Sequence, residues 1–313
     1  MISVLGGGVA GLCAATALAE RGLTVEVIVP EGAPAPVSLL AGGMLAPFCE
    51  GEAAPAAVVK MGLSAADWWE AHGARVVRRG TLVLAPARDA AELDRFARLT
   101  QGHEWVDPGA LEPDLAGRFA RGLFFGDEAH MDPCAALATL RRRLEARGVR
   151  FHAGPARGRI VDCTGWAAAA HLPDLRPVRG EMLMLHAPGV ALSRTVRLLH
   201  PRFACYIVPR GDGHYMIGAT MVESARLGPV TARAVMELLS AAWTVHPGFA
   251  EAEITATGAG LRPAFPDNIP AIRRTGGRIH VNGMYRHGFL AAPHLAMRLA
   301  DQLQEECKPC VSS

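Results

Sequence analysis

Three glycines near the start of the chain have the spacing of a phosphate-binding turn. The apolar residues 2–5 predict a short strand that runs into Gly6-x-Gly8-x-x-Gly11, and helical spacing follows. Gly6 permits the tight turn, Gly8 lets a pyrophosphate approach the backbone, and Gly11 lets helix and strand pack closely. A second apolar segment, residues 24–29, predicts the next strand. The sequence therefore predicts a dinucleotide site, with the phosphates at the start of the helix.

Arg262 has the residue type and the setting of an anion-binding group. It stands between Leu261 and Pro263 at the end of a predicted apolar strand, where a buried guanidinium needs an anionic partner. A guanidinium is planar, permanently charged and able to donate two parallel hydrogen bonds to a carboxylate. From the residues alone two interpretations stay open: Arg262 binds a carboxylate ligand, or it is a structural arginine paired with Asp267 or another acid.

No group of residues in the sequence has the spacing of a metal site or of a hydrolase. His130 and Asp132 are candidate ligands, but Asp132 directly precedes Pro133 and better suits the N-cap of a predicted helix. The sequence has no Cys/His cluster with metal spacing and no Gly-x-Ser-x-Gly motif. Cys307 and Cys310 have a metal or redox spacing without a second pair. We therefore expect no metal, and a C-terminal tail without function.

The composition favours a soluble globular enzyme. Of 313 residues, 50% are hydrophobic and 20% are charged. The 32 basic and 30 acidic residues nearly cancel, so binding to nucleic acid or to an anionic membrane is not expected. No segment is long and apolar enough to span a bilayer, and the glycine-interrupted start lacks the basic region of a signal peptide. Seven scattered cysteines fit reduced thiols, so we expect a cytoplasmic location.

Apolar periodicity and turn residues predict a chain of mixed α/β type. Helices are expected over residues 64–72, 90–99, 133–147, 231–243 and 293–304. Strands are expected over residues 149–152, 160–163, 178–186, 253–260 and 278–283, with a strand pair around Gly80 in 75–84 and further strands within 206–219. Strands thus alternate with helices near both ends of the chain and dominate between them.

These elements predict two domains, each assembled from separate parts of the chain. The strand and helix units with the glycine turn are expected to form a Rossmann-like domain from residues 1–55, 131–176 and 258–313. The intervening residues 56–130 and 177–257 carry more alternating strand patterns. From them we expect a second, largely antiparallel α+β domain that holds the substrate.

Eight short motifs follow one another along nearly the whole chain. They are residues 6–11 (GGGVAG), 41–47 (AGGMLAP), 162–166 (DCTGW), 206–210 (YIVPR), 217–221 (IGATM), 260–263 (GLRP), 267–270 (DNIP) and 286–293 (RHGFLAAP). Each motif is common alone, but their order is specific. The set resembles the D-amino-acid oxidase family of flavoenzymes, and most closely its glycine oxidases of thiamine biosynthesis.

The resemblance implies FAD, rather than NAD, as the cofactor. It implies that the first loop binds the pyrophosphate and that residues 41–44 lie alongside the flavin. The turn at residues 286–290 would lie at the pyrimidine end, where backbone amides and a helix start stabilise negative charge. The implied cofactor-binding residues are Gly6, Gly8, Val9, Ala10, Gly11, Glu31, Ala41, Gly42, Gly43, Met44, Thr164, Gly165, Trp166, Arg286, His287, Gly288, Phe289 and Leu290.

Two departures from the family pattern concern the adenosine half of this site. The second strand usually ends with an acidic residue that holds the ribose, but Val29 stands there and Glu31 follows two residues later. Either Glu31 takes that role or the ribose is held more loosely. The link over residues 151–160 is also shorter than the hairpin that relatives usually carry, which contacts the adenine.

The resemblance implies oxidative deamination of glycine, or of a small amine or amino acid, to the imine. Oxygen would be reduced to H2O2, and the imine would serve thiazole formation for thiamine. Arg262 would bind the substrate carboxylate, Tyr206 would donate its hydroxyl to the same group, and Met221 would form an apolar wall. Simple packing is the alternative for Tyr206 and Met221. At His287 the backbone is expected to contribute more than the imidazole.

Two rival functions stay open at this point. A D-amino-acid or secondary-amine dehydrogenase would pass its electrons to an acceptor other than oxygen, and the yield of peroxide would separate the two. A flavin-binding protein without catalysis is compatible with Val29 and the shortened link. The expected partners are a small amino acid or amine and O2, without nucleic acid or membrane, and a homo-oligomer is compatible with the sequence.

Overall fold

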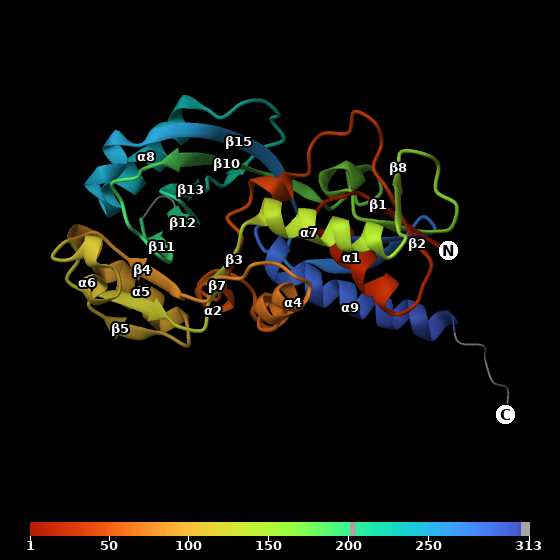
Figure 1. Cartoon of the computed structure of the whole chain (residues 1–313), viewed down its shortest axis with the longest axis horizontal. Helices are drawn as coiled ribbons and strands as arrows, with labels where there is room; N and C mark the ends of the chain where they lie inside the picture. Colours follow the sequence, from red (N-terminus) through yellow and green to blue (C-terminus); the bar gives the residue numbers. More distant parts are fainter. Residues whose placement is uncertain (201–204, 308–313) are drawn as a thin grey trace.

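The computed structural model describes residues 1–200 and 205–307, and two large sheets organise them (Figure 1). The first sheet has the order β16-β17-β9-β1-β2-β8. Its neighbouring strands are parallel, except that β16 and β17 are antiparallel. These strands are β1 (Ile2–Leu5), β2 (Val25–Ile28), β8 (Arg150–His152), β9 (Arg159–Asp162), β16 (Ala271–Thr275) and β17 (Arg278–Asn282).

Three helices accompany the first sheet: α1 (Val9–Glu20), α7 (Pro133–Ala146) and α9 (Gly288–Cys307). Helix α1 packs against both α7 and α9, and the three lie beside one another in Figure 1. Every residue of α1 from Val9 to Leu18 is buried. A helix that is apolar all round is one that is covered on all sides. The glycine turn therefore leads from an interior strand directly into a fully buried helix.

The second sheet has the order β14-β10-β13-β12-β11-β4-β6-β5, and β15 pairs with β10 outside this path. Its pairs are antiparallel, except that β4 and β11 are parallel. Helix α8 (Ala232–Val245) packs on β10, β12 and β13. The strands are β4 (Thr81–Leu84), β5 (Glu104–Val106), β6 (Gly122–Phe125), β10 (Arg176–His186), β11 (Thr195–Leu198), β12 (Cys205–Gly211), β13 (His214–Gly218), β14 (Val222–Glu223) and β15 (Glu253–Ala264).

Strands β10 and β15 form a long antiparallel pair that reaches from the second sheet toward the first (Figure 1). In their register Gly180 faces Gly260 and Val178 faces Arg262. Smaller elements lie between and beside the two sheets (Figure 1). They include η1 (Val37–Leu40), β3 (Met44–Leu45), α2 (Pro47–Glu50), α3 (Ala56–Gly62), α4 (Ala65–Ala71), α5 (Ala91–Leu99), α6 (Pro108–Leu111) and β7 (Ala129–His130).

Helices α3 and α4 pack against α9. Trp68 and Trp69 of α4 belong to the same buried apolar cluster as α1. Residues 56–71 thus contribute to the core on the side of the first sheet, although the sequence groups them with the second. The division of the chain into two domains at the predicted boundaries stays a prediction.

Helix α9 begins at Gly288, earlier than the predicted start at Pro293, which lies inside the helix. Proline has no N–H, so the carbonyl of Phe289, four residues earlier, loses its helical partner. The indole Nε1 of Trp69 donates to this carbonyl at 2.9 Å. A donor from a distant part of the chain thus replaces the missing hydrogen bond, and the helix continues through the proline.

The predicted strand pair around Gly80 is wrong: only β4, which begins at Thr81, is a strand there. Before it, Val77 makes an isolated bridge with His130. Gly80 itself has φ +72°, and its N–H donates to the carbonyl of Glu128 at 2.9 Å. The chain therefore turns at this glycine in a backbone region that other residues rarely adopt.

The helix predicted after Asp132 is confirmed as α7. Asp132 Oδ1 accepts from the N–H of Cys134 at 2.7 Å and from that of Ala135 at 3.2 Å, and Pro133 occupies the first turn. This is the N-cap that the sequence predicts, and it accounts for Asp132 without a metal. The helices expected at 64–72, 90–99 and 231–243 are found as α4, α5 and α8 with small shifts at their ends.

Five cysteines are free thiols: Cys13, Cys49, Cys134, Cys163 and Cys205. Cys307 and Cys310 have the spacing of a metal or redox pair, but Cys310 lies outside the described residues. Over residues 1–200 and 205–307 no helix has both the length and the apolar character that crossing a membrane requires.

Candidate active site

One cavity collects residues of the second sheet and of the helix starts that accompany the first sheet. It is lined by the start of α1, by η1 and the loop that follows, by β10, β12 and β15, and by the start of α9. It holds about 1240 Å³ of space, its open mouth included. The predicted site residues that line it are Val9, Ala41, Gly42, Gly43, Met44, Tyr206, Met221, Arg262, Arg286, Gly288, Phe289 and Leu290. Those that do not are Gly6, Gly8, Ala10, Gly11, Glu31, Thr164, Gly165, Trp166 and His287.

The glycine turn leaves no room for side chains. Gly6 has φ +102°, and a Cβ on it would lie 2.8 Å from the carbonyl oxygen of Cys163. A Cβ on Gly11 would lie 1.9 Å from the carbonyl oxygen of Gly6. The N–H of Val9, in the first turn of α1, donates to Ser38 Oγ at 3.2 Å. Backbone and helix start are thus presented at close range, as phosphate binding requires.

The loop after η1 forms a flat wall because two glycines lie in close contact with other parts of the chain. Gly43 has φ +68°, and a Cβ there would lie 2.2 Å from the carbonyl oxygen of Met131. A Cβ on Gly42 would lie 2.7 Å from Cε2 of Tyr206. A planar ring system can therefore approach the main chain of this loop closely.

Arg210 of β12 holds the same loop from the side of the second sheet. Its guanidinium donates to the carbonyls of Gly42 at 2.8 Å, Ala41 at 3.4 Å and Met131 at 3.3 Å. Burial lowers the pKa of Arg210, against the nearby Asp132, which raises it. Arg210 belongs to the motif at residues 206–210, but no role was predicted for it. Its contacts show that it positions the loop.

Arg262 projects from β15 across the backbone of β10. A Cβ on Gly180 would lie 2.3 Å from the Cζ atom of Arg262, so the guanidinium lies directly over this glycine. Its Nη1 donates to the carbonyl of Thr220 at 3.0 Å. Asp267, the predicted structural partner, instead accepts from the N–H of Ile269 at 2.9 Å and is exposed. Among the described residues no carboxylate lies within 4 Å of Arg262.

Tyr206 lies between two glycines in the same cavity. A Cβ on Gly42 would lie 2.7 Å from its ring, and one on Gly218 would lie 2.9 Å from it. Burial raises the pKa of Tyr206, while Arg262 lowers it, so the hydroxyl stays protonated. Within the part of the chain that the structure describes, this hydroxyl makes no hydrogen bond, so it is available to a ligand.

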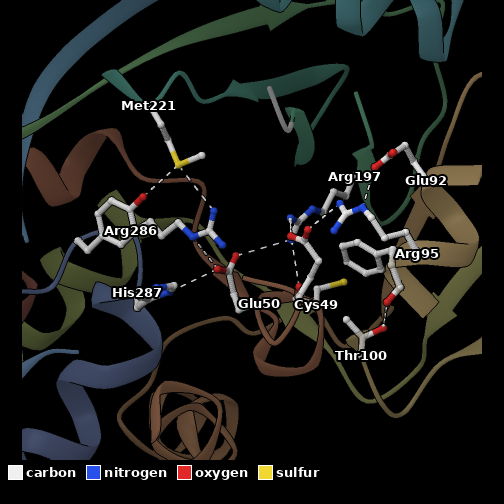
Figure 2. Close-up of polar contacts among 12 residues, drawn as sticks. Cys49, Glu50, Glu92, Arg95, Thr100, Arg197, Met221, Arg286 and His287 are labelled. Carbon is white, nitrogen blue, oxygen red and sulfur yellow. Dashed lines mark hydrogen bonds and ion pairs between the residues drawn. The ribbon is translucent and has the colours of Figure 1, made fainter. Parts of the chain in front are cut away.

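A buried carboxylate, Glu50, neutralises two other arginines of the cavity (Figure 2). Arg286 Nε lies 2.9 Å from Glu50 Oε2, and Arg197 Nη1 lies 4.0 Å from Oε1. Arg197 Nη2 also lies 3.3 Å from Glu52 Oε2. Burial raises the pKa of Glu50, but Arg286, His287 and Arg197 outweigh it and hold that pKa below its ordinary value. Glu50 and Arg197 were not predicted as site residues, because no sequence motif contains them.

His287 is 1% exposed and lies beside the same carboxylate, with Nδ1 3.4 Å from Glu50 Oε2. Burial lowers its pKa to about 4, because the attraction of Glu50 does not compensate for the loss of solvent and the nearby arginines. Neither ring nitrogen has a hydrogen-bond partner. The imidazole is therefore neutral near pH 7. The backbone N–H of His287 donates to the carbonyl of Met284 at 2.8 Å and shapes the turn before α9.

Met221 lies at the mouth of the cavity, across from the turn before α9 (Figure 2). Its Sδ accepts from the hydroxyl of Tyr285 at 3.4 Å and from Nη1 of Arg286 at 3.6 Å. The side chain is 44% exposed. Met221, which was predicted to form an apolar wall, thus also connects the segment after β13 with the turn before α9.

The residues predicted for the adenosine half lie at the ends of the parallel strands. Thr164 donates from its N–H and its Oγ1 to Asp162 Oδ1, at 3.1 and 2.6 Å. Glu31 is exposed, whereas the buried acid of β2 is Glu26. Glu26 accepts from Ser3 Oγ at 2.7 Å and from the N–H of Arg157 at 3.1 Å. Glu26 therefore fixes the shortened link. Binding of the ribose by Glu31 and looser binding of the ribose both stay predictions.

These features fit an extended dinucleotide with a flat ring at one end. The turn at Gly6 and Gly11 suits the pyrophosphate, and the wall at Gly42 and Gly43 admits a planar ring. Arg286 Nε is buried without an aligned hydrogen-bond acceptor. Bound FAD would supply a hydride acceptor here, and the start of α9, which lines the cavity, favours negative charge on a ligand.

The fold and the glycine turn together fit a class of proteins that bind a dinucleotide. A family model described as FAD dependent oxidoreductase (DAO) matches residues 1–302. The chain belongs to this family of FAD-dependent oxidoreductases. The family, the cofactor FAD and the assignment as an enzyme, all expected from the sequence motifs, are therefore confirmed.

One similar protein illustrates this membership, and two solved structures illustrate the fold. A Rhizobium etli protein named "Putative thiamine biosynthesis oxidoreductase ThiO" is 53% identical over 97% of this chain and 97% of its own length. Iminodiacetate oxidase (IdaA) from Chelativorans sp. BNC1 has a crystal structure with TM-score 0.84 and 23% identity, over 100% of this chain and 97% of that one. Glycine oxidase from Geobacillus kaustophilus gives TM-score 0.80 and 23% identity, over 99% and 96%. The predicted fold, a Rossmann-like α/β part with a largely antiparallel second sheet, is confirmed.

The glycine turn yields a test of cofactor binding. Replacement Gly11→Ala should give a protein that purifies without bound FAD, because the new Cβ would overlap the carbonyl oxygen of Gly6. The flavin content follows from the absorption ratio of the flavin band to protein, and circular dichroism reports folding. The matched control is Gly189→Ala, where a Cβ would meet nothing within 4 Å. A folded, fully yellow Gly11→Ala protein would contradict this assignment.

The buried histidines predict how stability depends on pH. The folded chain resists protonation of His287, whose pKa is lowered from 6.5 to about 4, whereas the unfolded chain accepts the proton. The free energy of unfolding should therefore decrease as pH falls from about 6.5 toward 4, by up to about 3 kcal/mol for this residue. His130, also lowered to about 4 by burial, adds to the decrease. Urea unfolding of His287→Asn at several pH values should show a shallower decrease, and an unchanged one would refute this.

Proposed function

We propose that the chain oxidises the amine of glycine, or of a small amino acid, to the imine, with O2 reduced to H2O2. The observation that carries this proposal is the environment of Arg262. Three arginines of the described residues line the cavity, and of these three only Arg262 lacks a carboxylate within 4 Å. A cation without a partner in a mostly enclosed site is stabilised by an anionic ligand. Amino acids supply such an anion next to the amine that is to be oxidised.

Arg262 and Tyr206 provide the groups that hold the substrate carboxylate. Arg262 is held over Gly180 by the carbonyl of Thr220, with its remaining N–H groups free for an anion. The Tyr206 hydroxyl is protonated and without a partner, so it donates to the same carboxylate. Two donors that fix one end of a small molecule also fix the direction of its α-carbon, and such orientation contributes much of the rate of a reaction.

Little other chemistry is needed from side chains. FAD, when bound, would supply the hydride acceptor and the two-electron reductant that the conversion of O2 to H2O2 requires. A substrate amine that arrives neutral needs no general base, because the C=N bond forms as the hydride leaves. His287, with its pKa of about 4, stays neutral and keeps positive charge from accumulating beside Arg286. The side chains of this site thus act by binding and orientation.

The charges of the cavity favour a substrate with one carboxylate. The name iminodiacetate oxidase describes a neighbour in structure that acts on a compound with two. Here Arg286 is paired with Glu50, and Arg197 with Glu52. A second substrate carboxylate would have to compete with these buried acids. The names of the Rhizobium etli protein and of the Geobacillus glycine oxidase support glycine as the substrate and thiazole formation for thiamine as the use of the imine.

The remaining expectations belong to the same proposal. We assign FAD binding to residues 1–55, 131–176 and 258–313, and substrate binding to residues 56–130 and 177–257. A cytoplasmic location and a homo-oligomer are further expectations. A dehydrogenase with another electron acceptor is the main alternative. A flavin-binding protein without catalysis would leave Arg262 and Tyr206 without a use.

Reduction of the flavin by glycine tests the reaction. Without air, glycine should bleach the flavin absorption of the purified holoenzyme, and admission of air should restore it with one H2O2 for each glycine. Sarcosine, D-alanine and iminodiacetate serve as comparison substrates. If D-alanine bleaches the flavin and glycine does not, D-alanine rather than glycine is the substrate. Bleaching without peroxide after air is admitted would favour the dehydrogenase, and no bleaching by any amine would refute the proposal.

Variants at Arg262 test its role in substrate binding. Arg262→Leu should keep the flavin colour, while kcat/KM falls by roughly 100-fold or more, since losing one partner of a buried charge pair costs about 2–5 kcal/mol. Arg262→Lys should recover only part of this, because an ammonium lacks the two-pronged geometry. Gly180→Ala should raise KM by displacing the guanidinium. The control is Arg233→Leu on the surface of α8, and a fully active Arg262→Leu enzyme would overturn the assignment.

A further inference from the structure

The mouth of the cavity is spanned by a methionine that the proposed reaction does not use. Met221 extends from the segment after β13, and its Sδ lies 3.4 Å from the hydroxyl of Tyr285 and 3.6 Å from Arg286 Nη1. Tyr285 and Arg286 belong to the turn that precedes α9. Thr220, next to Met221, is fixed by Glu181, whose Oε2 accepts from Thr220 Oγ1 at 3.1 Å. The methionine is thus a contact between two anchored sides of the opening.

Exposure distinguishes Met221 from the other methionines that line the cavity. Met221 is 44% exposed, whereas Met44 is half-buried and Met182 and Met284 are 6% and 7% exposed. Met236 on α8 is more exposed, at 65%, but lies outside the lining. Met221 therefore both lines the cavity and is exposed to solvent, so oxidant from either side reaches its side chain. Accessible thioethers are the ones that peroxide oxidises.

We propose that Met221 is an oxidation site through which H2O2 lowers the activity of the enzyme. The sulfur lone pair attacks one peroxide oxygen and the O–O bond breaks. The released hydroxide takes up the proton of the oxygen now bonded to sulfur and forms water. The thioether is oxidised to the sulfoxide, and the peroxide is reduced. The internal source of oxidant rests on the proposed function, but added H2O2 reacts in the same way. Methionine sulfoxide is reversible by methionine sulfoxide reductases, so the modification can act as a switch.

The surroundings of the sulfur explain why oxidation would affect the site. A thioether is a weak acceptor, whereas a sulfoxide oxygen is polar and accepts strongly. Tyr285 and Arg286 already donate toward this position, so they would bind the new oxygen. Arg286 would then be drawn from Glu50, its partner at 2.9 Å. Thr220, whose carbonyl holds Arg262, is adjacent in the chain. Oxidation thus acts on both the flavin side and the carboxylate side of the cavity.

An exposed thiol near the cavity could also react, and the experiment must separate its oxidation from that of Met221. Cys134 is an exposed free thiol whose Sγ donates to the carbonyl of Leu39 at 3.4 Å, near the cavity loop. Burial and the neighbouring Asp132 raise its pKa, so little reactive thiolate forms near pH 7. The Cys134→Ser background removes this thiol, and reductases specific for methionine sulfoxide do not restore oxidised cysteine.

The test exposes the FAD holoenzyme to added H2O2 without substrate, in the Cys134→Ser background. Peptide mass spectrometry measures the oxygen gained at each methionine. Binding of acetate, seen as a shift of the flavin absorption, reports the site without any turnover, and glycine oxidation is measured separately. Met221→Leu and Met236→Leu are treated in parallel, each compared with its own untreated sample. In a second arm, the enzyme turns over glycine with and without catalase.

We expect Met221 to gain oxygen early, with weaker acetate binding and loss of most activity in step, and recovery on treatment with the reductases. Met221→Leu should keep most of its own starting activity, while Met236→Leu should lose activity as the parent does. An unoxidised Met221 beside fully oxidised Met236, or equal losses in Met221→Leu and the parent, would overturn the proposal. An enzyme that oxidises no amine would refute the proposed function, while the mass and acetate data would still decide the role of Met221.

Discussion

The carboxylate of Glu50 decides how the positive charge of the cavity is distributed. It lies within 4.0 Å of both Arg286 and Arg197, and their charges hold it ionised in spite of its burial. Two of the three cavity arginines are thereby satisfied by protein groups, and Arg262 is left for a ligand. Without Glu50, Arg286 would join Arg262 as a cation without a carboxylate, whereas Arg197 would keep Glu52, and the proposed preference for one substrate carboxylate over two would be lost. Selectivity thus depends on an acid that is expected to make no contact with the substrate carboxylate.

Close backbone contacts bring the two sheets near enough to share one site. Gly180 admits the guanidinium of Arg262, and Gly42 and Gly218 admit the ring of Tyr206. Arg210 then ties the loop at Gly42 to β12 through carbonyl oxygens. A side chain at any of these glycines would displace Arg262 or Tyr206, the two groups proposed to bind the substrate carboxylate. The geometry of the site is therefore set as much by missing side chains as by those present.

The sequence predicts the local features of this arrangement well. The glycine turn, the cap at Asp132 and the strand that carries Arg262 each follow from a few neighbouring residues, and the structure contains all three. Tyr206, Met221 and Arg262 share one cavity, as the motif order implies. Glu50, Arg197 and Arg210 were not predicted as site residues, because their importance comes from packing between distant segments. The start of α9 was missed for the same reason: the donor that replaces the missing N–H of Pro293 comes from Trp69.

The packing of α9 against α1 also bears on how the protein folds during its synthesis. Helix α1 is synthesised well before α9, which is its main cover, and before β17, which pairs with β9 of the same sheet. At roughly 5–20 residues per second, translation of the chain between α1 and α9 takes on the order of half a minute. During that interval the mostly apolar α1 lacks the helix that covers it. Transient packing or a chaperone that shields α1 is therefore favoured by this topology.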